Sequence, residues 1–200
     1  MEFEATTVWM CGIEPKAEET GELLERAIAG DSAAFEQILY RYERRVVTLA
    51  WRLLGNPEDA QDASQEVFLR AFRYLPRFNA AKPIQPWLIR MTVNVCHDIG
   101  RKKQRLRSIF SDSGETFAEL PDADSLDAHA ALALEQRKAV LHRALAKLPE
   151  KERTAIVLRD LEGFSTAEVA EILGSSESTV RAQISSACVK IRKALKGVRP

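Results

Sequence analysis

A stripe of basic and amide side chains runs along residues 84–105, and side chains of these types in such a row bind nucleic acid. Its members recur every three or four residues, which places them on one face of a helix: Arg90, Asn94, His97, Arg101 and Gln104. More positive charge follows with Lys102, Lys103, Arg105 and Arg107. The preceding loop, 77–83, is also basic and polar, and a loop at a helix end can receive an extruded base. We therefore predict a nucleic-acid surface here.

A second polar stripe occupies the predicted helix 57–75. Its charged residues are again spaced by three or four: Asp59, Asp62, Glu66, Arg70 and Arg73. Two interpretations remain open. The stripe is either a docking face for a charged partner or a solvated helix face, with ion pairs worth only tenths of a kcal/mol each. From the residues alone, the solvated face is favoured.

Residues 165–189 have the pattern of a helix-turn-helix. Ser165 and Glu168 form a capping box, Ala170 allows two helices to cross closely, and Gly174 supplies the turn. A second helix should begin near Glu177, with Ser176 as its cap. This pattern is typical of a major-groove reader, and a generic helical hairpin is the alternative. The candidates for base or phosphate contact on the second helix are Arg181, Gln183, Ser185 and Ser186.

Helical periodicity dominates the sequence, and no stretch has sustained strand alternation. We therefore expect an all-α protein with two small helical domains and an acidic flexible linker. The expected divisions are a tail 1–18, a helical domain 19–107, a linker 108–128 and a helix-turn-helix domain 129–200. Caps are expected at Asp31, Gly55, Asn56-Pro57 and Pro149, with a helix ending before Pro76 and the next beginning near Pro86-Trp87.

The apolar positions of the two helices in the first domain predict their buried faces. For the helix 57–75 these are Ala60, Ala63, Val67, Phe68, Ala71, Phe72 and Leu75. For the following helix they are Trp87, Leu88, Met91, Val95 and Ile99. The histidines have no neighbouring metal-ligand or catalytic pattern, so His97, His129 and His142 are expected to be polar surface residues.

The formal net charge of zero conceals four charge blocks. Residues 1–66 carry −8, residues 67–110 carry +9, residues 111–136 carry −7 and residues 137–200 carry +6. Solvated helix faces usually mix signs, so such blocks favour charged partners. The alternative is that the blocks attract one another within the protein.

The same sequence argues against several classes of protein. Its three cysteines lie far apart, which excludes a disulfide framework and fits a reducing cytosol. No apolar run approaches the ~20 residues of a membrane span, and no signal peptide is expected, so we predict a cytoplasmic protein. It has no clustered His/Cys/Asp set, phosphate loop or nucleophile motif. We therefore expect no enzyme, no metal and no cofactor.

Three segments together resemble a known family. Region two of bacterial sigma factors resembles the segments DAQDASQEVFLRAFRYLPRF (59–78) and PWLIRMTVNVCHDIGRKKQR (86–105). Region four resembles LPEKERTAIVLRDLEGFSTAEVAEILGSSESTVRAQISSA (148–187). No region three is visible between them, and this layout is similar to the extracytoplasmic-function group. The resemblance implies a subunit that gives core RNA polymerase its promoter specificity, without enzymatic activity.

The resemblance also assigns roles to residues. It implies docking on the coiled coil of the polymerase clamp by Asp59, Asp62, Gln65, Glu66 and Arg70. It implies contact with the melted −10 element by Arg77, Asn79, Lys82, Arg90, Asn94, Arg101, Lys102 and Lys103. It implies recognition of the −35 duplex by Ser176, Ser178, Thr179, Arg181, Gln183, Ser185 and Ser186. The expected partners are core polymerase, duplex and single-stranded promoter DNA, and an anti-sigma factor.

This chain departs from the family pattern in two places. Gln183, Ser186 and Cys188 stand where recognition helices of the family usually carry basic residues, which weakens phosphate contact. Ile84-Gln85-Pro86 replaces a more usual aromatic approach to Trp87. The alternative function is a conventional helix-turn-helix regulator, which would bind DNA tightly by itself.

Overall fold

The computed structural model describes residues 17–109 and 139–196, and every regular element in these two ranges is helical. We call them the N-terminal block and the C-terminal block. The N-terminal block contains α1 (Ala17–Ile28), α2 (Ser32–Leu54), α3 (Pro57–Tyr74), the 3₁₀ turn η1 (Leu75–Arg77) and α4 (Ile84–Ile109). The C-terminal block contains a helical segment at 139–146, α6 (Glu150–Ile156), the π-helical turn η2 (Val157–Leu161), α7 (Thr166–Leu173) and α8 (Glu177–Lys196).

The predicted caps fix the helix ends in the N-terminal block. Asp31 Oδ1 accepts hydrogen bonds from the amides of Ala33 and Ala34 at 3.0 and 3.1 Å, which starts α2. At its other end Gly55 adopts φ 74°, which favours glycine, and its amide donates to the Trp51 carbonyl at 2.8 Å. Asn56 then caps α3 by accepting from the Asp59 amide. These predictions are confirmed, so the loop between α2 and α3 is tight.

The helix after the 77–83 loop begins slightly earlier than expected. It starts at Ile84 instead of near Pro86-Trp87, because a proline in the first turn has no amide that the helix would use. Ile84 itself is buried, which anchors this end. The helix continues to Ile109, so it includes the first two positions of the predicted linker, 108 and 109. The rest of that linker and the predicted tail up to residue 16 lie outside the described residues.

The helix-turn-helix is present with its predicted details. Ser165 Oγ accepts from the Glu168 amide, and Glu168 Oε2 accepts from the Ser165 amide, which completes the capping box at the start of α7. Gly174 ends α7 with φ 60°. Val169 and Val180 are fully buried, and Ala170 is 6% exposed. The crossing of α7 and α8 is therefore closed by small side chains.

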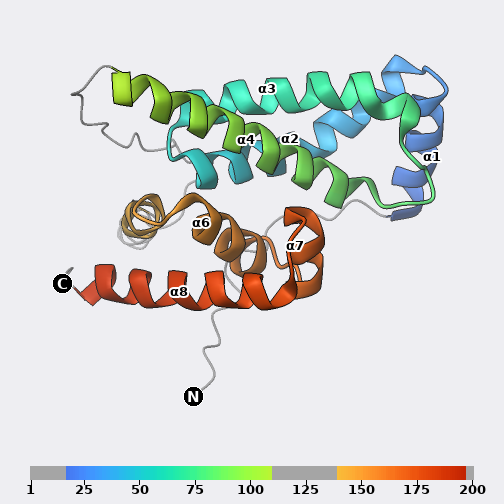
Figure 1. Ribbon diagram of the computed structural model, residues 1–200. Coiled ribbons are helices and arrows are strands. Elements are labelled where there is room, and N and C mark those ends of the chain that lie inside the picture. Colours follow the sequence, from blue (N-terminus) through green and yellow to red (C-terminus); the bar gives the residue numbers. More distant parts are fainter. Residues whose placement is uncertain (1–16, 110–138, 197–200) are drawn as a thin grey trace, which may run out of the picture.

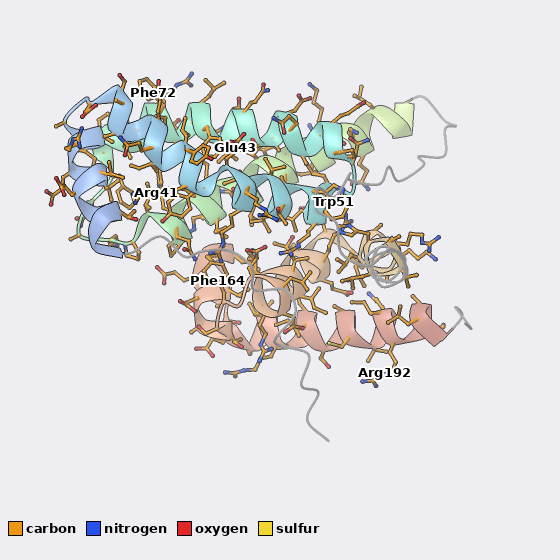
Figure 2. All side chains as sticks on the ribbon, turned by 180° about the vertical axis from the view of Figure 1, so that it is seen from behind. Arg41, Glu43, Trp51, Phe72, Phe164 and Arg192 are labelled. Carbon is orange, nitrogen blue, oxygen red and sulfur yellow. The ribbon has the colours of Figure 1, made fainter. Side chains whose placement is uncertain are left out.

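The two blocks pack against each other over a shared apolar core. Figure 1 shows α2, α3 and α4 as one layer, with α6 and α7 between that layer and α8. Buried Leu49 and Leu53 of α2 belong to the same apolar cluster as Leu148 and Ile156 of the C-terminal block. In the view from behind, Trp51 and Phe164 lie at the boundary of the blocks (Figure 2). The described residues of the two blocks therefore form one folded unit.

The buried faces of α4 and α3 each differ from the expectation. On α4, Ile89, Val93 and Cys96 are at most 2% exposed although they lie outside the predicted stripe, because the C-terminal block covers a second face of this helix. On α3 the placement of Phe72 in the core was wrong, since its side chain is 58% exposed. It lies beside the Phe35 ring, 5.2 Å between centroids, at the edge of the helical layer.

Candidate nucleic-acid interface

Some residues of the basic stripe on α4 are exposed to solvent, and others contact the C-terminal block. Asn94, Arg101 and Lys102 are exposed. His97 turns away from this surface, because its Nε2 lies 3.0 Å from Thr154 Oγ1 and its Nδ1 lies 3.3 Å from Glu150 Oε1, both on α6. Burial lowers the pKa of His97, and the negative charge of Glu150 partly opposes that shift. The expectation of a polar surface histidine was therefore wrong for His97.

Arg90 begins the stripe and contacts the helix-turn-helix directly. Its Nε donates to the Ile172 carbonyl at 3.1 Å, and its Nη2 donates to the Glu171 carbonyl. Both carbonyls belong to the last turn of α7, the negative end of the helix dipole. The two parts of the chain that carry predicted DNA contacts are therefore joined at this residue.

The loop before α4 displays polar groups on an ordered turn. Arg77, Asn79 and Lys82 are exposed. Asn79 Oδ1 accepts from the Ala81 amide at 3.0 Å, and the Asn79 carbonyl accepts from the Lys82 amide at 2.9 Å. The rings of Phe78 and Trp87 pack with centroids 4.9 Å apart, which fastens the loop to the first turn of α4.

The predicted polymerase-docking stripe lies on α3, next to the DNA stripe of α4. Asp62 and Gln65 are exposed. Glu66 Oε1 accepts from Arg70 Nε at 2.6 Å within the helix. Asp59, whose side chain is only 16% exposed, pairs with Lys103 Nζ at 2.5 Å. The structure thus brings a residue of the docking set into contact with one of the −10 set.

Asp98 gives the two stripes a second connection. Its carboxylate pairs with Arg101 at 2.8 Å and with Arg70 of α3 at 3.6 Å. Both interpretations of the α3 stripe retain support, because ion pairs line the helix face while Asp62 and Gln65 remain open to a partner. The roles of these residues stay predictions.

An apolar patch extends the α3 face toward its C-terminal end. Leu69 and Phe72 are 64% and 58% exposed. They border a groove of about 550 Å³ that is also lined by Ile28, Phe35 and Leu75. Sequence reasoning missed this groove because helical periodicity assigned Phe72 to the core. Exposed apolar surface of this kind often marks a protein-binding site.

The start of α8 presents hydroxyl groups and one cation. Ser176 Oγ accepts from the Thr179 amide at 3.2 Å and lies within 2.9 Å of the hydroxyls of Ser178 and Thr179. Arg181 is exposed, and its Nη2 lies 2.5 Å from Glu177 Oε2 one turn earlier. The helix start is therefore rich in groups that can contact phosphates.

The later residues of the predicted −35 set, which lie further along α8, differ in their exposure to solvent. Ser185 is exposed, whereas Gln183 and Ser186 are half-buried. Ser186 Oγ donates to Glu152 Oε1 of α6 at 3.0 Å, and Lys190 pairs with the same carboxylate at 2.7 Å. The −35 roles of all these residues stay predictions.

Within residues 17–109 and 139–196, no group of three or more His, Cys, Asp or Glu side chains is arranged to hold a metal ion. In the same ranges, no helix has the length and apolar character needed to cross a membrane.

Comparison with known proteins decides the family. Residues 39–106 match the pattern described as Sigma-70 region 2, and residues 138–191 match Sigma-70, region 4. The chain is 31% identical over 184 residues to the RNA polymerase sigma-H factor of Pseudomonas aeruginosa, covering 89% of this chain and 94% of that protein. It is 31% identical over 172 residues to the ECF RNA polymerase sigma factor SigW of Bacillus subtilis, covering 84% and 91%. The chain belongs to the extracytoplasmic-function sigma factors.

A solved structure supports the same assignment for this sigma factor. CnrH, in a complex with the cytosolic domain of CnrY, superposes with a TM-score of 0.65 at 27% identity, covering 90% of this chain and 99% of CnrH. Membership in the family means that this sigma factor acts with core RNA polymerase and promoter DNA to direct transcription initiation.

Proposed function

We propose that this sigma factor uses two surfaces of its N-terminal block and one of its C-terminal block to place RNA polymerase at promoters. The observation that carries the proposal is the pair of neighbouring faces on α3 and α4. Asp62 and Gln65 are exposed on α3, and Asn94, Arg101 and Lys102 are exposed on α4. One block can therefore dock on the polymerase clamp coiled coil with one helix and hold −10 DNA with the next.

At the −10 element the protein captures a DNA base after that base has left the stack of base pairs. Unstacking costs a few kcal/mol, and no nucleotide hydrolysis is needed if favourable contacts to the extruded base offset that cost. The amide of Asn94 can pair with a base edge, while Arg101 and Lys102 neutralise phosphates. The exposed loop residues Arg77, Asn79 and Lys82 extend this surface toward the start of α4.

At the −35 element α8 contacts duplex DNA in the major groove. Ser176, Ser178 and Thr179 at the helix start suit phosphates, and Arg181 suits the O6 and N7 atoms of guanine. Gln183 and Ser185 follow on the same helix, with Ser186 nearer to α6. Only Arg181 is basic in the first two turns of α8, so we infer weak binding by this block alone.

Four further assignments belong to the proposal. The domains are a tail 1–18, a region-two domain 19–107, a linker 108–128 and a region-four domain 129–200. The protein acts in the cytoplasm, where its polymerase is, and catalyses no reaction. An anti-sigma factor is a further partner, since the solved relative CnrH is bound to CnrY and an RpoE of Bartonella quintana is bound to the anti-sigma factor NepR.

Co-purification with core polymerase, followed by run-off transcription on a promoter library, tests this proposal. The expected result is a stoichiometric complex that starts transcripts at a subset of promoters sharing −35 and −10 sequences. Tight, sequence-specific DNA binding by the free protein, with no effect on core polymerase, would instead support the conventional regulator.

A further inference from the structure

A carboxylate that belongs to neither predicted binding set lies between two arginines, one from each set. Asp98 is on α4. Its Oδ1 lies 2.8 Å from Nη2 of Arg101, a −10 residue, and its Oδ2 lies 3.6 Å from Nη1 of Arg70, a docking residue on α3. Arg70 Nε in turn donates to Glu66 Oε1 at 2.6 Å. Figure 1 shows α3 and α4 in the same layer. We call these four side chains of alternating charge the charge row.

The surroundings of Asp98 on α4 are otherwise basic. Asp98 lines a surface depression of about 390 Å³ together with Arg101, Lys102, Arg105 and Leu106. Among the described residues that line this depression, Asp98 is the one with a negative charge. On a surface for DNA a carboxylate repels the phosphates, so Asp98 does not help to bind DNA by direct contact. Its contacts with two arginines indicate how it acts instead.

The charge row is accessible at both of its ends. The side chains of Glu66 and Arg101 are 44% and 60% exposed, and that of Asp98 is 53% exposed. DNA can therefore reach Arg101 while Asp98 is bound to it, so Asp98 lowers the net charge of that site without blocking it. Exposed ion pairs contribute little free energy, which means that these side chains can change partners readily.

Arg70 and Arg101 share the one carboxylate of Asp98. The contact between Asp98 and Arg70 is the longest in the charge row, and Arg70 is held at the same time by Glu66. Glu66 and, to a lesser degree, Asp98 raise the pKa of Arg70, so both carboxylates stabilise its charge. When Glu66 is occupied or neutralised, Arg70 is released toward Asp98. Asp98 then neutralises less of the charge of Arg101.

The composition of the docking set gives the sign of this effect. The set contains three carboxylates, on Asp59, Asp62 and Glu66, and one cation, on Arg70. A partner surface that fits this set is therefore basic, and it would pair with Glu66. Such pairing frees Arg70 for Asp98 and leaves more positive charge on the DNA face of α4.

We infer that Asp98 is a positioning residue that connects the two surfaces: by sharing its carboxylate between Arg70 and Arg101, it sets how much of the charge of Arg101 is available to −10 DNA. The inference rests on the proposed function, because it takes Arg70 as a docking residue and Arg101 as a −10 contact. Occupation of Glu66 shifts Arg70 to Asp98 and thereby strengthens DNA binding. The helices themselves need not move, since only side chains change partners.

The test measures binding of the full-length protein to a mixed-sequence 20-nucleotide single-stranded DNA by fluorescence anisotropy. Asp98→Asn should tighten binding about threefold, the effect of one charge about 6 Å from a phosphate in water. Arg70→Gln leaves Asp98 entirely to Arg101 and should weaken binding about twofold. Arg73→Gln is the matched control for Arg70→Gln, because Arg73 is an exposed arginine on the same helix outside the charge row.

Double variants separate the charge row from a simple effect of net charge. Combined with Asp98→Asn, Arg70→Gln should lose its effect on DNA binding, because the carboxylate through which it acts is absent. A charge that acts directly on DNA would instead cause the same loss in both backgrounds. Glu66→Gln should strengthen DNA binding when Asp98 is present and have no effect when it is not. Asp98→Glu keeps the charge and should retain both dependences.

Three results would contradict the inference. These are unchanged DNA binding in Asp98→Asn, an equal loss from Arg70→Gln in the two backgrounds, or a loss from Arg73→Gln that depends on Asp98 as strongly as that from Arg70→Gln. Circular dichroism checks that each variant retains its helices. Run-off transcription by the wild-type protein with core polymerase tests the proposed function separately. If transcription fails while the double variants show the coupling, Asp98 still connects the two arginines, and their assignment to polymerase and promoter DNA is wrong.

Discussion

His142 should make the contact between the two blocks sensitive to pH. It lies in the helical segment 139–146, and its ring packs on that of Trp51 from α2. Burial, followed by the nearby positive charge of Arg52, lowers the pKa of His142 from 6.5 to about 4. In an open protein the ring would be hydrated, and its pKa would return to the ordinary value. Protonation therefore opposes the closed state.

The sign and size of the effect follow from proton linkage. At pH 7.5 and above the imidazole is almost entirely neutral in both states, and the closed state has its full stability. As the pH falls from 6.5 toward 4, only the open state takes up the proton, so the closed state loses stability. Between pH 7.5 and pH 5.5 the loss is about 1.4 kcal/mol, or about tenfold in the ratio of closed to open protein. His97, whose pKa burial also lowers, adds an effect of the same sign.

Energy transfer between one dye on each block, measured from pH 7.5 to pH 5.5, should follow this transition. His142→Phe is the matched control, because phenylalanine keeps an aromatic ring against Trp51 but cannot be protonated. We expect the wild type to open on acidification and the variant to open less. Equal responses of the two proteins, with helical content constant, would refute the role assigned to His142.

Three further predictions concern the binding surfaces. Reversing the charges of Asp62 and Glu66 to lysine should weaken binding to core polymerase at least tenfold, since like charges at an interface cost several kcal/mol, and a pull-down titration at constant helical content would show it. Asn94→Ala should reduce opening of duplex promoters, whereas a pre-melted bubble should restore part of the loss, and normal permanganate footprints in the variant would contradict the base contact. Arg181→Ala should relax −35 specificity by about 1–3 kcal/mol while −10 recognition persists, as measured by transcription from promoters with substituted −35 bases.

Features set by neighbouring residues were predictable from the sequence. The caps at Asp31, Asn56 and Ser165 depend on side chains that bond to amides two or three positions away, so local pattern is sufficient to find them. The left-handed turns at Gly55 and Gly174 are local for the same reason. This explains why the bounds of α2, α3 and α7 agree with expectation to within a residue or two.

Features that depend on contact between the blocks were not predictable from one helix at a time. Thr154 and Glu150 lie more than fifty positions from His97 in the sequence, and no local spacing pattern indicates that these side chains contact His97. Cys96 lies outside the predicted buried stripe of α4 but is 2% exposed, and burial raises the pKa of its thiol to about 12. Phe72 shows the opposite error, because apolar periodicity cannot distinguish a core residue from one at an exposed groove.

The wider turn η2 takes up one extra residue before the chain reaches Glu162. Here the Glu162 amide donates to the Val157 carbonyl at 3.0 Å, five positions back, and such a turn holds one residue more than an α-helical turn. Deleting a single residue between Val157 and Leu161 would restore ordinary winding and leave the following chain in nearly the same rotational phase, because an α-helical turn is completed with one residue fewer. Glu162 would then still face α2. A one-codon deletion at this turn should thus preserve the packing of the helix-turn-helix on the N-terminal block, whereas the same deletion inside α2 would rotate the residues that follow it by about 100°.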